Sequence, residues 1–404
     1  MQNHTRRAAY LSIILLGIVS LMGDIVYEGG RSIIPYFLEF LGASAVLIGF
    51  VGGLGDFLGY VIRPLAGYWA DVSQRYWFFT FLGYFLIISI PFLAFVIFLP
   101  NKWQLGMAIS LIMIERVGKA LRAPSRDTIL SIVSKGVGSG KAFGIHETLD
   151  QIGAIIGPLI IGLLVSSAID FTNIFGVLFI PFLILLFALG YAYRKIENLP
   201  IMEESRKNAR RTGIKRERLN KKFYIYSFAV FVNSMGLINI LLVISEAGHI
   251  LPEYVWFGPI IYVVIMGVDA LAAYPSGYFY DKIGIKFLII PFIFTALASI
   301  MVLISHDIYT ILIASMLFGI VLGIQESVYR AVITDVAPLE SRGTAYGIFN
   351  TIYGLGLLIG GVIYGFFIDL SINIMIVSLY AVITQFIAIY LLLRCIKDSK
   401  NKIK

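Results

Sequence analysis

Cysteine is almost absent from this sequence, whose 404 residues include a single one, Cys395. One thiol excludes an internal disulfide and any metal site made of several cysteines. Histidine is rare as well, with four residues, and charged residues make up only 14% of the chain. Outside the apolar segments the sequence has no nucleotide-binding glycine loop, no metal cluster and no nucleophile beside a base. We therefore expect neither an enzyme nor a bound cofactor or metal.

Long polar stretches are also missing, with one exception at residues 194–222. This segment holds eleven Lys and Arg residues against four Glu, so it carries +7 of the chain's net charge of +8. The other basic and acidic residues nearly cancel, so the basic character of the chain does not indicate nucleic-acid binding. We interpret the segment as a solvated linker whose charge fixes topology. The alternative is that it binds the anionic inner face of a membrane.

Hydrophobic residues make up 59% of the sequence, and its mean hydropathy is +0.88. A chain of this composition cannot hide its apolar side chains in one soluble core, so we expect a lipid bilayer around it. A bilayer core of about 30 Å is crossed by roughly 20 apolar residues in a helix. Twelve segments are long enough: 9–39, 44–70, 77–99, 103–123, 140–167, 171–193, 222–246, 252–280, 286–305, 308–334, 342–369 and 372–395.

The Lys and Arg residues between these segments predict their orientation. The even-numbered loops, the linker and both tails hold the basic residues, whereas the odd-numbered loops hold only Lys102. Because cytoplasmic loops are rich in Lys and Arg, we expect both termini and the linker on the cytoplasmic side of the plasma membrane. The start of the chain resembles the basic beginning of a signal peptide. Its first apolar segment is too long, however, and no convincing cleavage site follows, so we expect it to be retained.

Two patterns of the first half recur in the second. Gly67 and Asp71, at the end of the second segment, match Gly277 and Asp281 with an offset of 210 residues. The other pattern is a set of glycines with an offset of 203: Gly144, Gly153 and Gly157, then Gly347, Gly356 and Gly360. One chain therefore carries two copies of a six-segment unit. We expect an N-terminal bundle at 1–193, a cytoplasmic linker at 194–222 and a C-terminal bundle at 223–404.

These repeats resemble the major facilitator superfamily of secondary transporters over the whole chain. Its loop signature, a glycine, three residues, an acid, then basic residues and glycine, is nearly complete in the second copy and degenerate in the first, where Val72 and Gln74 replace a base and a glycine. Arg116 falls where the family has a buried arginine. The residues of the loop signature are Gly67, Asp71, Arg75, Gly277, Asp281, Lys282, Gly284 and Lys286.

The fifth segment resembles the motif of the family's proton-driven efflux antiporters, with Ile161 in place of an expected glycine. Its residues are Gly144, Gly153, Gly157, Pro158 and Gly162. The resemblance implies an all-α membrane protein with twelve transmembrane helices in two pseudo-symmetric six-helix bundles. It also implies alternating access, with the loop acids as a gate between helices. Glycines at this spacing let helix backbones approach closely, and plain helix packing is the alternative interpretation of their role.

Ionisable residues inside a membrane are costly and usually line a cavity, so they indicate the functional site. Asp24, Glu28 and Arg31 follow one another at steps of four and three and therefore share one helical face. At about 1.5 Å per residue, Asp24 lies roughly 22 Å along the first segment, near the middle of the membrane. It is also placed where the family's antiporters carry a first-segment acid. Asp24 is therefore the first candidate for a proton carrier, ahead of Glu28.

The fourth and fifth segments add further charge at membrane depth: Glu115, Arg116, Lys119, Arg122, Arg126, His146, Glu147 and Asp150. We expect Glu115 and Asp150 to take part in proton coupling, and a substrate cavity to be lined by Arg31, Arg116, Lys119, His146 and Glu147, with Arg122 and Arg126 closer to the cytoplasm. The alternative is a fixed network of ion pairs that braces the first half. A divalent-metal site at His146, Glu147 and Asp150 is a weaker alternative.

The second half is poorer in charge and richer in amides and aromatic residues, among them Asn233, Asn239, Asp269, Gln325, Glu326, Asn350 and Tyr353. This asymmetry predicts proton chemistry in the first half and recognition of substrate shape in the second, with Asp269 as an alternative inner gate.

From these observations we expect a monomeric proton-coupled exporter of a small cationic or amphipathic organic compound, with protons, substrate and lipid as its partners. The alternatives are a proton symporter that imports a nutrient, a facilitator without ion coupling and a divalent-metal exporter. A membrane receptor would need a signalling domain, for which the linker and tails are too short.

Overall fold

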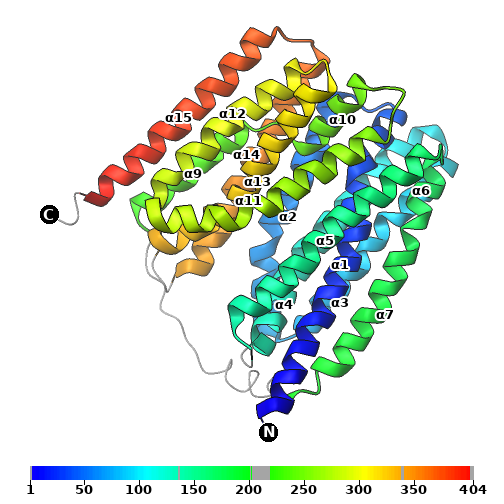
Figure 1. Ribbon diagram of the computed structural model, residues 1–404, viewed down its shortest axis with the longest axis vertical. Coiled ribbons are helices and arrows are strands. Elements are labelled where there is room, and N and C mark those ends of the chain that lie inside the picture. The colour runs from blue at the N-terminus through cyan, green and yellow to red at the C-terminus, as the bar shows by residue number, and fades with distance from the viewer. Residues whose placement is uncertain (1, 135–136, 201, 203–218, 338–340, 401–404) are drawn as a thin grey trace. The chain divides into compact units, whose positions relative to one another are not determined.

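The computed structural model describes residues 2–134, 137–200, 202, 219–337 and 341–400. Every regular element in these ranges is a helix (Figure 1), so the predicted all-α class is confirmed. The first half contains α1 (Gln2–Phe40), α2 (Ala45–Ser73), α3 (Tyr76–Phe85), η1 (Leu86–Ser89), η2 (Pro91–Phe98), α4 (Asn101–Ser134), α5 (Ser139–Ser166), α6 (Phe171–Val177) and α7 (Phe179–Ile196). The second half contains α9 (Lys221–Met235), α10 (Ile240–Ile250), α11 (Phe257–Ile283), η3 (Gly284–Leu288), α12 (Ile289–Ile304), α13 (Ile308–Val336), α14 (Arg342–Asp369) and α15 (Ile374–Lys400). Most of the basic linker, at 203–218, lies outside the described residues.

Ten helical stretches in the described part of the chain are long and apolar enough to cross a membrane. Nine coincide with one predicted segment each. The tenth, 257–304, contains two, because α11, η3 and α12 follow one another without a break. The remaining predicted segment falls on α4, which is too polar to qualify because it carries ionisable residues from Glu115 to Asp127. All twelve predicted segments therefore fall on helices.

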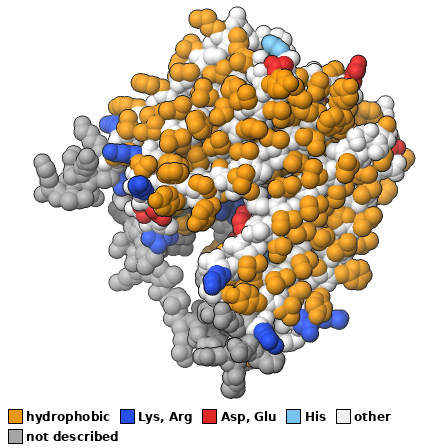
Figure 2. Space-filling model, in the orientation of Figure 1, with side chains coloured by type: hydrophobic (Ala, Val, Ile, Leu, Met, Phe, Trp, Pro, Cys, Tyr) orange, Lys and Arg blue, Asp and Glu red, His pale blue; other side chains and the backbone are white. Residues whose placement is uncertain are grey.

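Large hydrophobic side chains are exposed along these helices. Phe187 on α7 has 80% of its surface exposed, and Phe386 on α15 has 72%. The face of the molecule drawn in Figure 2 is largely covered by hydrophobic side chains, and Lys, Arg, Asp and Glu are sparse on it. An apolar surface of this extent is typical of a protein whose outer solvent is lipid.

The chain forms two compact units. The first unit contains residues 1–31 and 62–214, and the second unit contains residues 32–61 and 215–404. α1 and α2 therefore each contribute to both units. The predicted bundles at 1–193 and 223–404 assign residues 32–61 to the first half of the chain, and those boundaries stay a prediction.

In the first unit, α5 lies directly against α1 because two glycines leave no side chains between the backbones. A Cβ atom on Gly153 would lie 2.5 Å from the carbonyl oxygen of Leu21, and one on Gly157 would lie 2.6 Å from that of Ile25. Any larger residue would push the helices apart, as expected for small residues at a transmembrane helix contact. Of the other residues in this motif, Pro158 lies inside α5, Gly162 is buried and Gly144 has open space around it.

The second unit repeats this contact between α14 and α9. A Cβ atom on Gly356 would lie 2.7 Å from the carbonyl oxygen of Phe231 and 2.9 Å from the Cβ of Ser234. In the first unit the corresponding neighbour of Gly153 is the Cβ of Asp24, at 3.0 Å. Gly153 and Gly356 are 203 residues apart, and their neighbours Asp24 and Ser234 are 210 residues apart. These are the two offsets of the sequence repeat. Ser234 therefore occupies in the second copy the place that Asp24 occupies in the first.

Residues 32–61 belong to the second unit through direct contacts with its helices. The Tyr36 hydroxyl donates a hydrogen bond of 3.0 Å to the carbonyl oxygen of Ile244 on α10. Gly49 on α2 and Gly361 on α14 are in backbone contact, with no room for a Cβ on either residue. The last part of α1 and the first part of α2, which the predicted topology places toward the non-cytoplasmic side of the membrane, are thus held by α10 and α14.

Candidate functional site

The first unit contains a charged cluster built from α1, α4 and α5. It consists of five acids and four bases: Asp24, Glu28, Glu115, Asp127, Asp150, Arg116, Lys119, Arg122 and Arg126. The close contact of α1 with α5 brings the acids of these two helices together. The sequence analysis named all of these residues except Asp127.

Glu115 is almost completely buried and has two arginine partners on its own helix. Its Oε1 lies 3.2 Å from Arg122 and its Oε2 lies 3.9 Å from Arg116. Arg122 also donates to the carbonyl oxygen of Gly83 at 3.4 Å, which ties α4 to α3. Such a buried and paired carboxylate braces a structure, because removing one partner leaves an uncompensated charge. For Glu115 the geometry therefore favours the bracing alternative over proton coupling.

Tyr27 on α1 links the basic residues of the cluster. Its hydroxyl oxygen accepts hydrogen bonds from Lys119 at 3.2 Å, from Arg31 at 3.2 Å and from Arg116. Lys119 also lies over the ring, 4.2 Å from its centroid, and pairs with Glu28 at 3.6 Å. Cations over an aromatic face are stabilised by the ring's electron density. Sequence reasoning missed Tyr27, although its spacing of four residues from Arg31 places both on one helical face.

Arg126 joins α4 to α5 and α1. It lies 2.9 Å from Asp127, 3.9 Å from Asp150 and 2.8 Å from the hydroxyl of Ser20. His146 is buried one turn before Asp150, and its Nε2 has no hydrogen-bond partner among the described residues. The predicted cavity residue Glu147 is exposed. The described residues hold no group of three His, Cys, Asp or Glu side chains placed to bind a metal ion.

Asp24 differs from the other four carboxylates of the charged cluster. Each of those has a cationic partner within 4 Å, whereas Asp24 makes no hydrogen bond or ion pair with any residue that the structure describes. The charges acting on it most are those of Asp150, Glu28, Lys119 and Arg122. Its side chain is partly exposed, although the residue lies in the middle of α1. Asp24 is thus a partly exposed acid in the middle of a helix that is long and apolar enough to cross a membrane.

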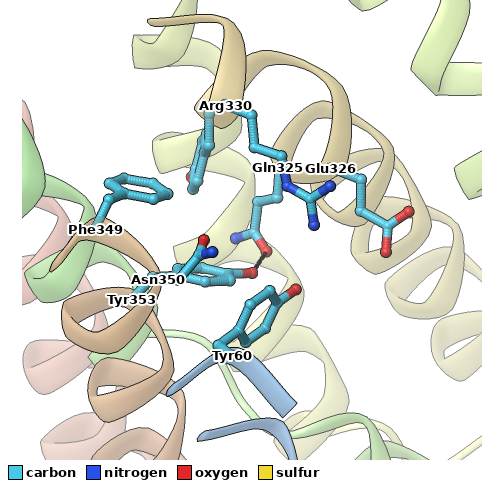
Figure 3. A pocket seen from close by; sticks show the side chains of 8 residues that line it. Tyr60, Gln325, Glu326, Arg330, Phe349, Asn350 and Tyr353 are labelled. Atoms are coloured by element: carbon cyan, nitrogen blue, oxygen red, sulfur yellow. Dashed lines mark hydrogen bonds between the residues drawn. The ribbon is translucent and has the colours of Figure 1, made fainter. Parts of the chain in front are cut away.

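The second unit contains an aromatic pocket between α2, α13 and α14 (Figure 3). Its cavity volume is about 10 Å³, roughly the room for one water molecule, and it is lined by Tyr60, Gln325, Glu326, Tyr329, Arg330, Phe349, Asn350 and Tyr353. The rings of Tyr60 and Tyr353 meet edge to face at 4.9 Å. The Tyr353 hydroxyl donates a hydrogen bond of 2.9 Å to Oε1 of Gln325. Of the predicted cavity residues, Glu326, Asn350 and Tyr353 line this pocket.

Asn233 lies behind the pocket and holds one of its walls. Its Oδ1 accepts a hydrogen bond of 2.6 Å from the Tyr329 hydroxyl, and its Nδ2 donates to Gln385 at 2.7 Å and to Thr295 at 3.2 Å. Asn239, predicted as a cavity residue, instead caps α10 by accepting from the N–H of Leu241. In this structure Asn233 therefore orients Tyr329 and Asn239 caps α10, and neither of them lines the pocket.

The α5 and α14 positions of the two copies correspond through the glycine offset of 203 residues. By this offset the pocket residues Phe349, Asn350 and Tyr353 correspond to His146, Glu147 and Asp150, respectively, in the first copy. One copy therefore carries ionisable groups where the other carries rings and an amide. Sequence reasoning missed Tyr60, because no local pattern connects α2 with α14.

The loop signature lies at helix ends and is mostly exposed. Asp71 accepts a hydrogen bond of 3.0 Å from the Tyr76 hydroxyl, while Asp281 has no hydrogen bond or ion pair with the described residues. Gly284 has a φ of 70°, a conformation that L side chains rarely adopt. The remaining signature residues are Gly67, near Pro124, Gly277, in open space, and Arg75, Lys282 and Lys286, which are exposed. Asp269, the alternative gate, is buried on α11.

Ten apolar helical stretches in the described part of the chain, together with the more polar α4, indicate a multi-pass membrane protein, and the ionisable residues within α1, α4 and α5 are typical of one that moves a solute. The sequence profile of the Major Facilitator Superfamily matches residues 13–361 and, in a second match, residues 227–404. The chain therefore belongs to the Major Facilitator Superfamily, and the protein is a membrane transporter and not an enzyme.

Comparison with individual proteins gives the same family. An uncharacterized protein of Mycobacterium tuberculosis (strain ATCC 25618 / H37Rv) is 32% identical over 383 residues, which cover 93% of this chain and 90% of that protein. An uncharacterized MFS-type transporter of Methanocaldococcus jannaschii is 26% identical and covers 91% of both chains. The crystal structure of the nucleoside transporter NupG has a TM-score of 0.71 at 14% identity, over 94% of this chain and 98% of that one. At this identity the structure shows a shared fold alone.

Proposed function

We propose that this transporter is a proton-coupled exporter of a small cationic or amphipathic organic compound, with Asp24 as the proton carrier. It lies in the plasma membrane with both termini in the cytoplasm and acts as a monomer. The observation that carries the proposal is the position of Asp24, an acid at membrane depth without a cationic partner among the described residues. A coupling group must gain and lose a proton during transport, and a carboxylate held in a tight ion pair resists this.

The two-copy architecture supports the assignment of proton chemistry to one half. Ser234, which cannot carry a proton in this way, stands at the position equivalent to Asp24. The ionisable residues that α5 carries are also replaced on α14, where rings and an amide occupy the corresponding positions. This asymmetry supports a first copy that carries the proton and a second copy that recognises the substrate.

Proton loss at Asp24 adds a negative charge beside Glu28 and Asp150. It thereby attracts Lys119 and Arg122 away from their present partners. Proton gain leaves those cations with Glu28 and Glu115. The protonation state of Asp24 thus selects between two sets of ion pairs for Lys119 and Arg122. Packed helices change between discrete arrangements and do not deform continuously, so each set of ion pairs can favour one arrangement of the helices.

The resemblance of the fifth segment to the antiporter motif favours export. Gly153 and Gly157 of this motif hold α5 against α1 at Asp24, so the motif and the proton carrier lie in direct contact. A proton symporter with the same acid is the alternative function. The direction of substrate movement relative to an imposed pH gradient distinguishes the two.

The test is Asp24→Asn, which keeps the size and polarity of the side chain but cannot release a proton. A substrate is first found by thermal-stability screening of the purified protein against lipophilic cations, organic acids, sugars and metal ions. In proteoliposomes, the variant should still exchange this compound across the membrane but should no longer accumulate it when a pH gradient is imposed.

Glu28→Gln is the matched control, because Glu28 lies one helical turn away and is paired with Lys119. Its expected effect is a lower melting temperature, since the partner cation loses its counter-charge. Full gradient-driven accumulation by a stable Asp24→Asn protein would contradict the proposal. Accumulation that requires protons to move in the same direction as the compound would establish the symporter instead.

A further inference from the structure

The last part of α1 meets α10 in a charged contact that belongs to the second unit. Glu39 on α1 accepts a hydrogen bond from the hydroxyl of Ser245, and its Oε1 lies 3.8 Å from Nε2 of His249. Nδ1 of His249 lies 3.5 Å from Oε1 of Glu246, which precedes it by three residues on α10. Two carboxylates from two helices therefore flank one histidine.

Both ring nitrogens of His249 face carboxylate oxygens, which is the arrangement expected of a protonated histidine. A neutral imidazole has one N–H donor, and its other nitrogen presents a lone pair that a carboxylate repels, whereas an imidazolium donates from both nitrogens. The charges that act on His249 are those of Glu246 and Glu39, and two nearby negative charges stabilise the charged ring. The contact between α1 and α10 is therefore strongest when His249 carries a second proton.

The rest of this contact does not change with pH near neutrality. The ring of Tyr36 on α1 packs against Gly248, on which a Cβ atom would lie 2.1 Å from the ring, and its hydroxyl donates to the carbonyl oxygen of Ile244. A tyrosine keeps its proton to about pH 10, whereas a histidine titrates near about pH 6.5. The side chain of His249 is 60% exposed, so it can exchange protons with the surrounding water.

We propose that Glu39, Glu246 and His249 form a proton-operated latch between α1 and α10, which is tight in acid and loose above neutral pH. The predicted topology puts the latch on the non-cytoplasmic side, so the pH outside the cell sets it. Outside acid then holds one end of α1, the helix that also carries Asp24. The latch goes beyond the proposed function, because it needs neither a transported compound nor proton release from Asp24.

Labelling of one buried thiol measures how often the latch opens. Ser245 is 1% exposed, and its hydroxyl faces Glu39 across the contact. In a Cys395→Ser background, Ser245→Cys provides a single thiol that a water-soluble maleimide reaches when α1 moves away from α10. The labelling rate of purified protein is measured on both sides of the usual histidine titration, at about pH 5.5 and about pH 8.5, without a pH gradient.

His249→Gln removes the proton site and keeps a polar side chain. Its labelling rate is divided by that of the protein with His249 at the same pH, which cancels the pH dependence of the maleimide reaction itself. We expect this ratio to be about threefold at the acid pH, the size expected for one exposed ion pair, and about one at the alkaline pH. Glu39→Gln removes the partner on α1, so its ratio should likewise be higher in acid.

His306→Gln is the matched control, because His306 is an exposed histidine just before α13 and should give a ratio of about one at both pH values. The latch is overturned if the ratio for His249→Gln is the same at both pH values. It is also overturned if the ratio for Glu39→Gln does not change with pH, since His249 would then act within α10 alone. Failure of the proposed function reads out separately, as gradient-driven transport that survives Asp24→Asn.

Discussion

Asp369, the last residue of α14, holds the beginning of α2. Its carboxylate oxygens accept hydrogen bonds from the backbone N–H groups of Ala45 at 2.8 Å and Val46 at 2.9 Å. The first N–H groups of a helix have no partner within the helix, and the positive end of its dipole favours a carboxylate there. Asp369→Ala removes both bonds. We therefore expect α2 to separate from α14 more often.

The size of this effect follows from the kind of contact. Replacing a capping side chain by alanine costs about 0.5 to 2 kcal/mol, and because Asp369 is exposed we expect about 1 kcal/mol. A change of this size multiplies the population with an open contact about fivefold. The protein should stay folded, because the backbone contact of Gly49 with Gly361 is unchanged.

A cysteine at Leu242 reports on the opening of this contact. Leu242 on α10 is fully buried, and one of its methyl carbons would lie 3.2 Å from a Cβ atom on Gly49. In a Cys395→Ser background, Leu242→Cys provides a single thiol whose reaction with a water-soluble maleimide requires α2 to move away. We expect about fivefold faster labelling when Asp369→Ala is added.

Asp307→Ala is the control for a lost helix cap. Asp307 accepts from the N–H groups of Tyr309 at 2.8 Å and Thr310 at 3.0 Å, all at the start of α13. This cap joins no two distant segments, so its loss should leave the labelling rate unchanged. Unchanged labelling in Asp369→Ala, or an equal rise in Asp307→Ala, would refute the reasoning.

Two further predictions concern charges in and near the membrane. Glu115→Gln should lower the free energy of unfolding by about 3 kcal/mol in a denaturation experiment, because buried Arg122 loses its partner at 3.2 Å. Arg122→Gln added to it should restore part of the loss, and a double variant less stable than the single one would contradict this. Asp281→Asn should leave the melting temperature unchanged, because Asp281 has no partner among the described residues. A clear drop in the melting temperature would show that the loop signature is already engaged in this conformation.

The helical segments could be predicted because hydropathy is a property of each segment by itself. A run of apolar residues long enough to cross a bilayer must form a helix there, since its backbone polar groups find no water. α4 is the instructive case, because its charges make it too polar for a hydropathy criterion. Its ionisable residues begin only at Glu115, so the apolar residues before them still predicted a segment at 103–123.

The members of the charged cluster could be predicted, but their pairing could not. Spacing along one helix placed Asp24 and Glu28 on a common face. Which of them meets Lys119 depends on how far α1 is shifted and rotated against α4. Those shifts follow from contacts between helices, such as Gly153 against Leu21, and the sequence names the glycine but not its neighbour.

The sequence by itself determined that this protein is a twelve-span membrane transporter with charge concentrated in its first copy. Composition, periodicity and internal repeats suffice for this, because each is read along the chain. Only the tertiary structure decided that Asp24 forms no ion pair with a described residue and that Tyr60 and Tyr353 meet beside the amide of Gln325. The physical reason is that pairing and pocket shape depend on the register of helices distant in sequence, which close backbone contacts set once the chain has folded.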